Sequence, residues 1–351
     1  MSRFSIVIPA YNPNEQDFQD CLNSIAEQSF SDYELIVVDD GSHDAGRIQR
    51  IVDASRIENV AKVVRTPNRG PYAARRRGIS CASGDYVISV DSDDELIGEG
   101  ALARISTALE DLGLPDYLLI SATRDRSSLT RLCDYSGLGV EGQGPVAVAP
   151  EAFNSLFISE NAFNSACCKV VKRNLFREIK EPLPRIVMAD DRYLAIDYLP
   201  HASSAGLLNM PLYYYRPSIG STTRSAYTVD LYRQVDYVEQ RVLGWVDSSR
   251  YDERAWAGGF LRLTSNHLCA LCRNPSYSRA DVMRACELLV TLPSLERAFN
   301  FLDQLDPGSF EARQLSLLKS GAYARFVDVT RAYNVMNYFV GLARAVRARL
   351  Q

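Results

Sequence analysis

Two carboxylates follow directly after a short apolar run. Residues 86–90 are rich in β-branched and aromatic side chains, and Asp91-Ser92-Asp93 comes next. Carboxylates beside a buried strand are costly to desolvate, and a hard divalent cation such as Mg²⁺ or Mn²⁺ removes that cost. Asp91 and Asp93 are therefore candidate metal ligands that would bridge to a phosphate. The triplet also fits a polar loop whose acids begin a helix, and the motif alone leaves both interpretations open.

Two further polar clusters follow apolar runs in the same way. Pro-Ala-Tyr-Asn at 9–12 follows the run 6–8, and Asp-Asp-Gly-Ser at 39–42 follows the run 35–38. Asp40 is a candidate acceptor for the N–H groups of a nucleobase, and Tyr11 could stack on that base. The alternatives are an ordinary turn with a helix cap for the acids and a core position for Tyr11.

A run of three arginines begins at Arg75. The surrounding pattern predicts a helix over 72–82, on which Arg75 and Arg77 point about 200° apart. At least one of them then faces something specific rather than solvent. Arg75 is the candidate for a phosphate contact, because a guanidinium binds phosphate oxygens in a bidentate manner.

The order of the elements indicates how these clusters are positioned. The apolar runs alternate with amphipathic patterns at 15–28, 44–54 and 72–82, which predicts βαβ units and an α/β fold with a mostly parallel sheet. Ligands of such sheets bind beyond the carboxyl ends of the strands, so the three clusters should meet in one crevice. Residues 106–225 show both helical and strand-like patterns. Helical patterns then dominate, at 230–246, 254–272, 278–290, 294–304 and 310–320.

Length and composition limit the function classes. With 351 residues, two domains are expected, which we place at 1–225 (halves 1–105 and 106–225) and at 226–351. A net charge of −4 argues against a nucleic-acid partner. No stretch approaches the ~20 apolar residues of a membrane span, and the start lacks the apolar core of a signal peptide, so a cytoplasmic protein is expected. The pair Cys269 and Cys272 near His267 is read as one face of a core helix rather than as a zinc site.

Taken together, the motifs resemble family 2 glycosyltransferases with the GT-A (Rossmann-like) fold. The segments that carry the resemblance are 9–12, 39–42, Asn-x-Gly at 68–70, Ala-Arg-x-x-Gly at 74–78, and Gly-Asp-Tyr at 84–86 leading to 91–93. Later segments continue it: Lys-Val-Val-Lys at 169–172, Asp-Asp at 190–191, Tyr-Tyr-Tyr-Arg at 213–216 and Gly-Ser-Thr-Thr at 220–223. The resemblance covers about residues 1–225, with the C-terminal region as an α-helical appendage.

The resemblance implies a reaction and a role for each matched residue. It implies transfer of a sugar from a nucleotide-diphosphate sugar, with UDP as the default, to a glycan or glycolipid acceptor in bacterial cell-surface polysaccharide synthesis. The matched donor-side residues are Pro9, Tyr11, Asp39, Asp40, Asn68, Arg75, Asp91 and Ser92, with Asp93 and Asp91 on Mn²⁺ or Mg²⁺. Asp191 matches the base of an inverting transfer. Asp190, Lys169 and Arg216 match the acceptor side, although the latter two could equally be solvated surface charges.

Two other functions are compatible with parts of the sequence. Residues 90–93 resemble the nucleophile strand of haloacid-dehalogenase-like phosphohydrolases, but Glu95 stands where that motif has Thr or Val. A non-catalytic sugar-nucleotide-binding subunit is the second alternative.

The C-terminal segment predicts a helix with an apolar stripe opposite arginines. The stripe consists of Val335, Phe339, Leu342, Val346 and Leu350. Such a helix suits either peripheral contact with an anionic membrane or packing against the body of the protein.

Overall fold

The chain forms two compact units, Met1–Phe157 with Ala162–Ile219, and Ile158–Asn161 with Gly220–Gln351. The computed structural model describes residues 2–55, 57, 61–127, 130–131, 135, 138, 142–159, 164–178, 183–217, 228–248 and 251–349. The side chains of 61, 339 and 341–349 are outside this description. The expected boundary at 225/226 and the segment 220–223 lie outside the described residues, so the domain limits stay a prediction.

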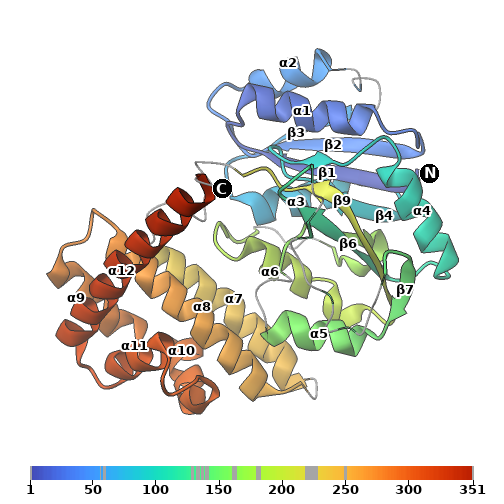
Figure 1. The fold of residues 1–351 in the computed structure, drawn as a ribbon. Coiled ribbons are helices and arrows are strands. Elements are labelled where there is room, and N and C mark those ends of the chain that lie inside the picture. The colour runs from blue at the N-terminus through green and yellow to red at the C-terminus, as the bar shows by residue number, and fades with distance from the viewer. Residues whose placement is uncertain are drawn as a thin grey trace. The chain divides into compact units, whose positions relative to one another are not determined.

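The N-terminal half of the first unit is a parallel sheet covered on both faces. Its strands are β1 (Phe4–Ala10), β2 (Tyr33–Asp39), β3 (Ala61–Arg65) and β4 (Tyr86–Ser89), in the spatial order β3-β2-β1-β4. The helices α1 (Glu15–Ala26) and α2 (Arg47–Asp53) lie on one face and α3 (Pro71–Cys81) on the other (Figure 1). Alternate residues of β2 serve the two faces: Leu35 and Val37 pack in the core with α1, and Ile36 and Val38 pack with Ala74 of α3.

The remaining strands extend the same sheet beyond β4. They are β8 (Lys169–Lys172), β6 (Tyr117–Thr123), β9 (Ala205–Tyr214) and the two-residue β5 (Glu95–Leu96), with β7 (Pro145–Val148) also paired to β9. β8 is antiparallel to both β4 and β6, whereas β9 is parallel to β6. Six strands therefore share one direction, which confirms the mostly parallel α/β fold. The helices of this half are α4 (Ala101–Asp111), α5 (Pro150–Ser159) and α6 (Asp190–Ile196).

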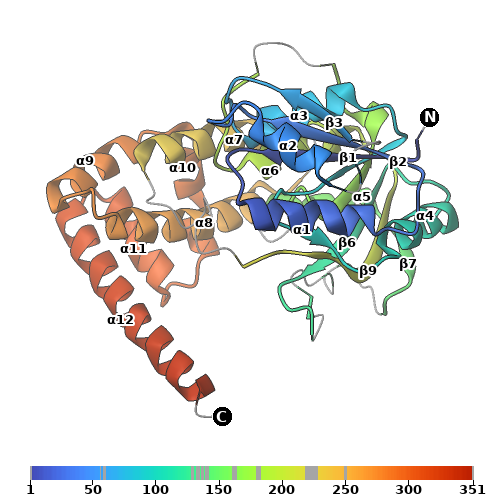
Figure 2. The ribbon, with the colours of Figure 1, turned by 90° about the horizontal axis from the view of Figure 1, so that it is seen from above.

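Strand register brings the three polar clusters together. Ala10 of β1 pairs with Asp39 of β2, and Val7 of β1 pairs with Ser89 of β4, so the carboxyl ends of all three strands adjoin. α3 packs closely beneath them, because a Cβ on Gly78 would lie 2.3 Å from Val7 Cγ1. This close approach requires glycine and fixes where α3 presents its arginines. Figure 2 shows the same strands from above, with α1 and α2 lying over them.

The second unit is helical, as the sequence predicts. It contains α7 (Val229–Ser248), α8 (Glu253–Arg273), α9 (Arg279–Leu289), α10 (Pro293–Ala298), a 3-10 helix at Phe299–Gln304, α11 (Phe310–Lys319) and α12 (Tyr323–Arg349). Ser278 forms a capping box with Asp281 at the start of α9. Cys269 and Cys272 are buried free thiols on α8, in agreement with a core helix. None of the described helices combines the length and apolarity that a membrane crossing requires.

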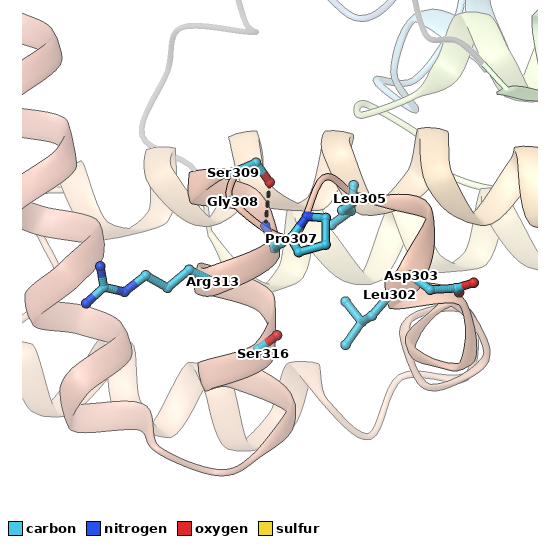
Figure 3. Close-up of a pocket in the computed structure, with 9 residues that line it drawn as sticks. Leu302, Asp303, Leu305, Pro307, Gly308, Ser309, Arg313 and Ser316 are labelled. Carbon is cyan, nitrogen blue, oxygen red and sulfur yellow. Dashed lines mark hydrogen bonds between the residues drawn. The ribbon is translucent and has the colours of Figure 1, made fainter.

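A cavity of about 490 Å³ lies in the second unit between the 3-10 helix and α11. Its lining includes Leu302, Asp303, Pro307 and Arg313, and Figure 3 shows Arg313 extending away from Leu302 and Asp303. Asp303 forms an ion pair with Arg254 at 2.5 Å and Arg313 is exposed. The cavity shares no residue with the site described next.

Candidate functional site

The loops after β1 and β2 are fastened to each other. Asn12 adopts a left-handed φ of 45°, its backbone N–H donates to Ser42 Oγ at 3.0 Å, and its side-chain oxygen accepts from His43 N at 2.9 Å. The ring of Tyr11 meets the ring of His43 edge-on at 5.9 Å and is 48% exposed. The core alternative for Tyr11 is therefore wrong, and its exposed ring is open to a stacking partner.

Asp39 and Asp40 are both buried and both bonded within the protein. Asp39 Oδ1 accepts from Ser42 N at 2.8 Å, and its other oxygen forms an ion pair with Arg65. Asp40 accepts from the backbone N–H groups of Arg69 at 2.9 Å and Gly70 at 2.8 Å. Burial raises the pKa of Asp40, and these two N–H groups oppose that rise. Asp39 thus fixes the turn after β2, and Asp40 holds residues 69 and 70 beside the end of that strand.

Arg75 lies at the centre of the acidic part of the site. It is only 4% exposed, and its Nη2 is 2.6 Å from Asp91 Oδ1. Its Nη1 forms an ion pair with Asp190 and lies 3.2 Å from Asp191 Oδ1, and its Nε donates to Ser89 Oγ at 3.1 Å. The solvated-face alternative is therefore wrong for Arg75. The guanidinium joins the end of β4 to the first turn of α6.

The Asp190–Asp191 pair has an unusual electrostatic environment. Burial and the neighbouring Asp191 carboxylate raise the pKa of Asp190 to about 7, although Arg75 opposes this. Burial also raises the pKa of Asp191, against Arg75 and Lys169. The Asp191 side chain is 32% exposed, so solvent or a substrate reaches it. A partly exposed carboxylate of raised basicity is suited to accept a proton.

The two cations that match the acceptor side in the sequence both have partners within the protein. Lys169 is 4% exposed, donates to the Ser165 carbonyl, and lies 5.9 Å from the Phe153 ring centroid. Arg216 forms ion pairs with Glu95 at 2.5 Å and Asp20 at 3.0 Å, and its Nε donates to the Asp93 carbonyl at 2.9 Å. Arg216 therefore fastens the segment after β9 to α1 and to the loop that carries Asp93.

A buried hydrogen-bond chain supports the 91–93 loop from below. The Tyr213 hydroxyl accepts from Asp91 N at 3.1 Å and donates to Asp94 Oδ2 at 2.7 Å. Asp94 Oδ1 accepts from Arg216 N at 2.8 Å. Burial and then Asp91 raise the pKa of Asp94 to about 8. The loop geometry thus depends on a tyrosine 122 positions away from Asp91.

The donor set of this loop fits a hard divalent cation. Among the described residues, one group offers three possible ligand atoms within 4.8 Å of one another, namely Asp91, Asp94 and Cys167. Burial raises the pKa of Cys167 well above its usual value, so its thiol is protonated and the carboxylates are the better donors. Asp93 is not in this group. Within the described part of the chain no arginine or lysine forms an ion pair with Asp93, although the nearby Arg216 opposes the rise of its pKa.

The structure therefore brings most of the predicted residues to one edge of the sheet. Pro9 pairs with Val38 just below the Tyr11 loop, and Asn68 lies against Gly41, whose added Cβ would be 2.7 Å from Asn68 N. Ser92 lies half-buried in the 91–93 loop. Sequence reasoning missed the residues that hold the site together, namely Arg65, Ser89, Asp94 and Tyr213. Tyr213 belonged to a quoted motif, but nothing local indicated its partner.

Comparison with known proteins agrees with this geometry. Residues 5–129 match the family model described as "Glycosyl transferase family 2". The structure of residues 1–349 of S. aureus TarS in complex with UDP-GlcNAc aligns over 95% of this chain and 91% of that chain, with a TM-score of 0.62 and 22% identity. That likeness shows the GT-A fold. Residues 5–129 are therefore similar to family 2 glycosyltransferases, which favours this family over the phosphohydrolase alternative.

Individual relatives match part of the chain. The amylovoran biosynthesis glycosyltransferase AmsB of Erwinia amylovora is 42% identical over 96 residues, 26% of this chain and 31% of AmsB. The poly(ribitol-phosphate) beta-glucosyltransferase of Bacillus spizizenii is 31% identical over 217 residues, 61% of this chain and 32% of that protein. The chain thus matches about a third of the length of these two relatives.

We predict that Tyr213→Phe destabilises the first unit. The change removes the hydrogen-bond partner of the buried Asp94 carboxyl group and the acceptor of Asp91 N, which costs about 1–3 kcal/mol of the free energy of unfolding. The matched control is Tyr215→Phe, because Tyr215 is half-buried and its hydroxyl changes stability by no more than about 0.5 kcal/mol. Urea unfolding at pH 7 measures both variants. Equal losses in the two would show that the Asp91–Tyr213–Asp94 chain does not support the loop.

Proposed function

We propose that the protein is an inverting, metal-dependent glycosyltransferase. It would move a sugar from a nucleotide-diphosphate sugar, by default a UDP-sugar, to a hydroxyl of a glycan or glycolipid acceptor in bacterial cell-surface polysaccharide synthesis. The observation that carries the proposal is the meeting of an exposed aromatic, an acidic loop and a basic carboxylate at one edge of the sheet. The names of AmsB and of the poly(ribitol-phosphate) transferase, and the UDP-GlcNAc complex of TarS, support the choice of substrates.

On the donor side, the proposal assigns the nucleotide to the crevice above β1 and β2. Tyr11 would stack on the base, and Asp40 would accept from its N–H groups through lone pairs not used by Arg69 and Gly70. Pro9 and Asp39 would line this pocket, Asn68 would lie along the nucleotide, and Asp91 and Ser92 would face the ribose. Asp39 acts mainly through the loop that it fixes, because Arg65 and Ser42 already occupy its carboxylate.

Asp93 and Asp91 would hold Mg²⁺ or Mn²⁺. When bound, the cation supplies positive charge to the diphosphate that leaves as the anomeric C–O bond breaks. The half-buried Asp93 has a raised pKa, caused first by burial and then by Asp91. A site that gathers carboxylates at this density gains from a bound cation, because the cation relieves their mutual repulsion.

On the acceptor side, Asp191 would take the proton of the attacking hydroxyl. Attack on the face opposite the leaving diphosphate needs one base and inverts the anomeric centre. Lys169 and Asp190 would set the charge around that base, and Arg216 would border the acceptor side through the segment that it fastens. A single carboxylate in contact with the crevice is sufficient for this reaction.

Nucleotide binding can be tested without turnover. UDP with Mn²⁺ should raise the melting temperature of the protein, because a ligand that binds only the folded state stabilises it. Tyr11→Ala should abolish the shift, since it removes the stacking face, and Asp93→Ala should remove the part that depends on Mn²⁺. His43→Ala is the control beside the ring. A shift that is equal in wild type and Tyr11→Ala would contradict the assignment of the base pocket.

The second prediction separates donor binding from transfer. Asp191→Asn keeps the shape of the side chain but cannot accept a proton, so transfer should fall about 10²–10⁴-fold while the UDP melting shift is unchanged. The measurement is product formation from UDP-sugars over a panel of glycan acceptors. Turnover close to wild type in this variant would remove Asp191 as the base. UDP binding by wild type without any transfer over the panel would favour the non-catalytic subunit.

We also propose that α12 contacts an anionic membrane surface, at which the enzyme would meet a glycolipid acceptor. Val335, Met336, Tyr338 and Val340 are 57%, 54%, 69% and 43% exposed. After Asp328 the sequence contains four arginines and no acid. Exposed apolar side chains followed by arginines are the composition of a helix that lies in the interface of an anionic bilayer. Four of the five stripe residues, from Phe339 onward, have side chains outside the described part.

Vesicle sedimentation tests this contact. Wild type should sediment with vesicles that contain phosphatidylserine and not with pure phosphatidylcholine vesicles, and Tyr338→Ser should bind several-fold less. Leu288→Ser is the matched control, because Leu288 is an exposed apolar residue of α9 at 48%. Equal binding to both vesicle types, or no effect of Tyr338→Ser, would contradict the proposal.

A further inference from the structure

We propose that Arg75 is a positioning residue that connects the donor side of the site to its base. This role replaces the direct phosphate contact expected from the sequence, and it rests on the proposed function for its catalytic meaning. The same guanidinium contacts Asp91, which follows β4, and both acids at the start of α6. The base would thereby be held at a fixed place relative to the donor.

The geometry leaves Arg75 little capacity for a ligand. Its Nε is used by Ser89, its Nη2 by Asp91, and its Nη1 by the Asp190–Asp191 pair. A guanidinium has five N–H donors in a rigid plane, and here its three nitrogens contact groups on two segments of the chain, 89–91 and 190–191. With the side chain 4% exposed, a phosphate would have to displace a carboxylate in order to reach it.

The positive charge of Arg75 also sets the acidity of the pair. Burial raises the pKa of both acids, and the attraction of Arg75 lowers it in each. An opposite charge in contact with a carboxyl typically shifts its pKa by about 1–3 units. The other groups that face the pair are Asp91 after β4, Lys169 on β8, the Cys167 thiol before it, and the Tyr198 hydroxyl after α6. Of these only Lys169 is a second cation.

Arg76 provides a matched control on the same helix. It is 5% exposed, its Nε lies 3.2 Å from Asp197 Oδ2, and it donates to the Arg177 carbonyl at 2.6 Å. It therefore also joins α3 to an acid, but to one that follows α6, at the other end of that helix from Asp190. Loss of either arginine leaves buried acid unpaired, so both variants should lose stability.

The first experiment needs no activity. It measures the melting temperature from pH 5 to pH 9 for wild type, Arg75→Gln and Arg76→Gln, without nucleotide or metal. An acid whose pKa is raised by folding binds its proton more tightly in the folded state, so its stabilising contribution is present at low pH and is lost as pH rises through the folded pKa. Arg75→Gln removes the charge that lowers the pKa of the pair, so its loss of stability should continue to a pH about one unit or more higher than in wild type. Arg76→Gln leaves the Asp190–Asp191 pair with its arginine, so its melting curve should lack this extension.

Conservative variants cover the case in which Arg75→Gln does not fold. Arg75→Lys keeps the positive charge and loses the planar guanidinium, so the pH dependence of its melting temperature should stay close to that of wild type. Asp190→Asn removes the like charge beside Asp191 and should flatten the pH dependence. Two outcomes would overturn the proposal. In the first, the melting curves of Arg75→Lys and Asp190→Asn both match that of wild type. In the second, the curves of Arg75→Gln and Arg76→Gln match each other.

The second experiment uses transfer kinetics. In Arg75→Gln kcat should fall at least tenfold and the acid limb of its pH profile should move upward, while UDP affinity in Mn²⁺ changes less than about threefold. Arg75→Lys should lower kcat and leave the acid limb of the pH profile unchanged. If Arg75→Gln loses UDP affinity and the acid limb of its pH profile stays where it is in wild type, Arg75 contacts the phosphate and the positioning role is wrong. Absence of transfer in wild type would refute the proposed function, and the melting curves would still decide the role of Arg75.

Discussion

A buried guanidinium is stable only where carboxylates surround it, and the acidic edge of the sheet is arranged around this requirement. Arg75 satisfies it by drawing Asp91 from the β4 end and Asp190 from α6 to opposite sides of one planar group. Each of those acids would be costly to bury alone. The cluster therefore has to form as a unit, and it fixes the position of α6 against the parallel half of the sheet.

The local sequence predicts only part of the structure at this edge of the sheet. The β-branched runs at 6–8, 35–38 and 86–90 and the clusters after them predict three adjacent strand ends, because parallel strands end on one side of a sheet. The register of β1 with β2 and β4 confirms this. The predicted helices over 15–28 and 72–82 are found within a few residues, since a stripe of apolar side chains and a proline at the start specify them.

What the sequence did not predict depends on contacts between distant segments. β3 and β8 were not predicted as strands, because each has only two adjacent valines between charged residues, and the apolar β6 lies in a stretch of mixed patterns. Arg75 and Asp190 are 115 positions apart, so no spacing rule connects them. The same holds for Asp40, whose expected role with a base coexists with two backbone hydrogen bonds to the 69–70 segment. Residue type indicated which side chains matter, and only the fold shows what they bind.

Two arginines divide the acids of the site between them. Arg75 neutralises Asp91 and the α6 pair, whereas Arg216 neutralises Asp20 and Glu95 and holds the carbonyl of Asp93. Neither arginine forms an ion pair with the carboxylate of Asp93 in the described part of the chain, although Arg216 opposes the rise of its pKa. Arg216 holds the backbone of Asp93 through its carbonyl. Under the proposed function, this leaves the Asp93 carboxylate for the cation, while the ion pairs of its neighbours hold the loop around it.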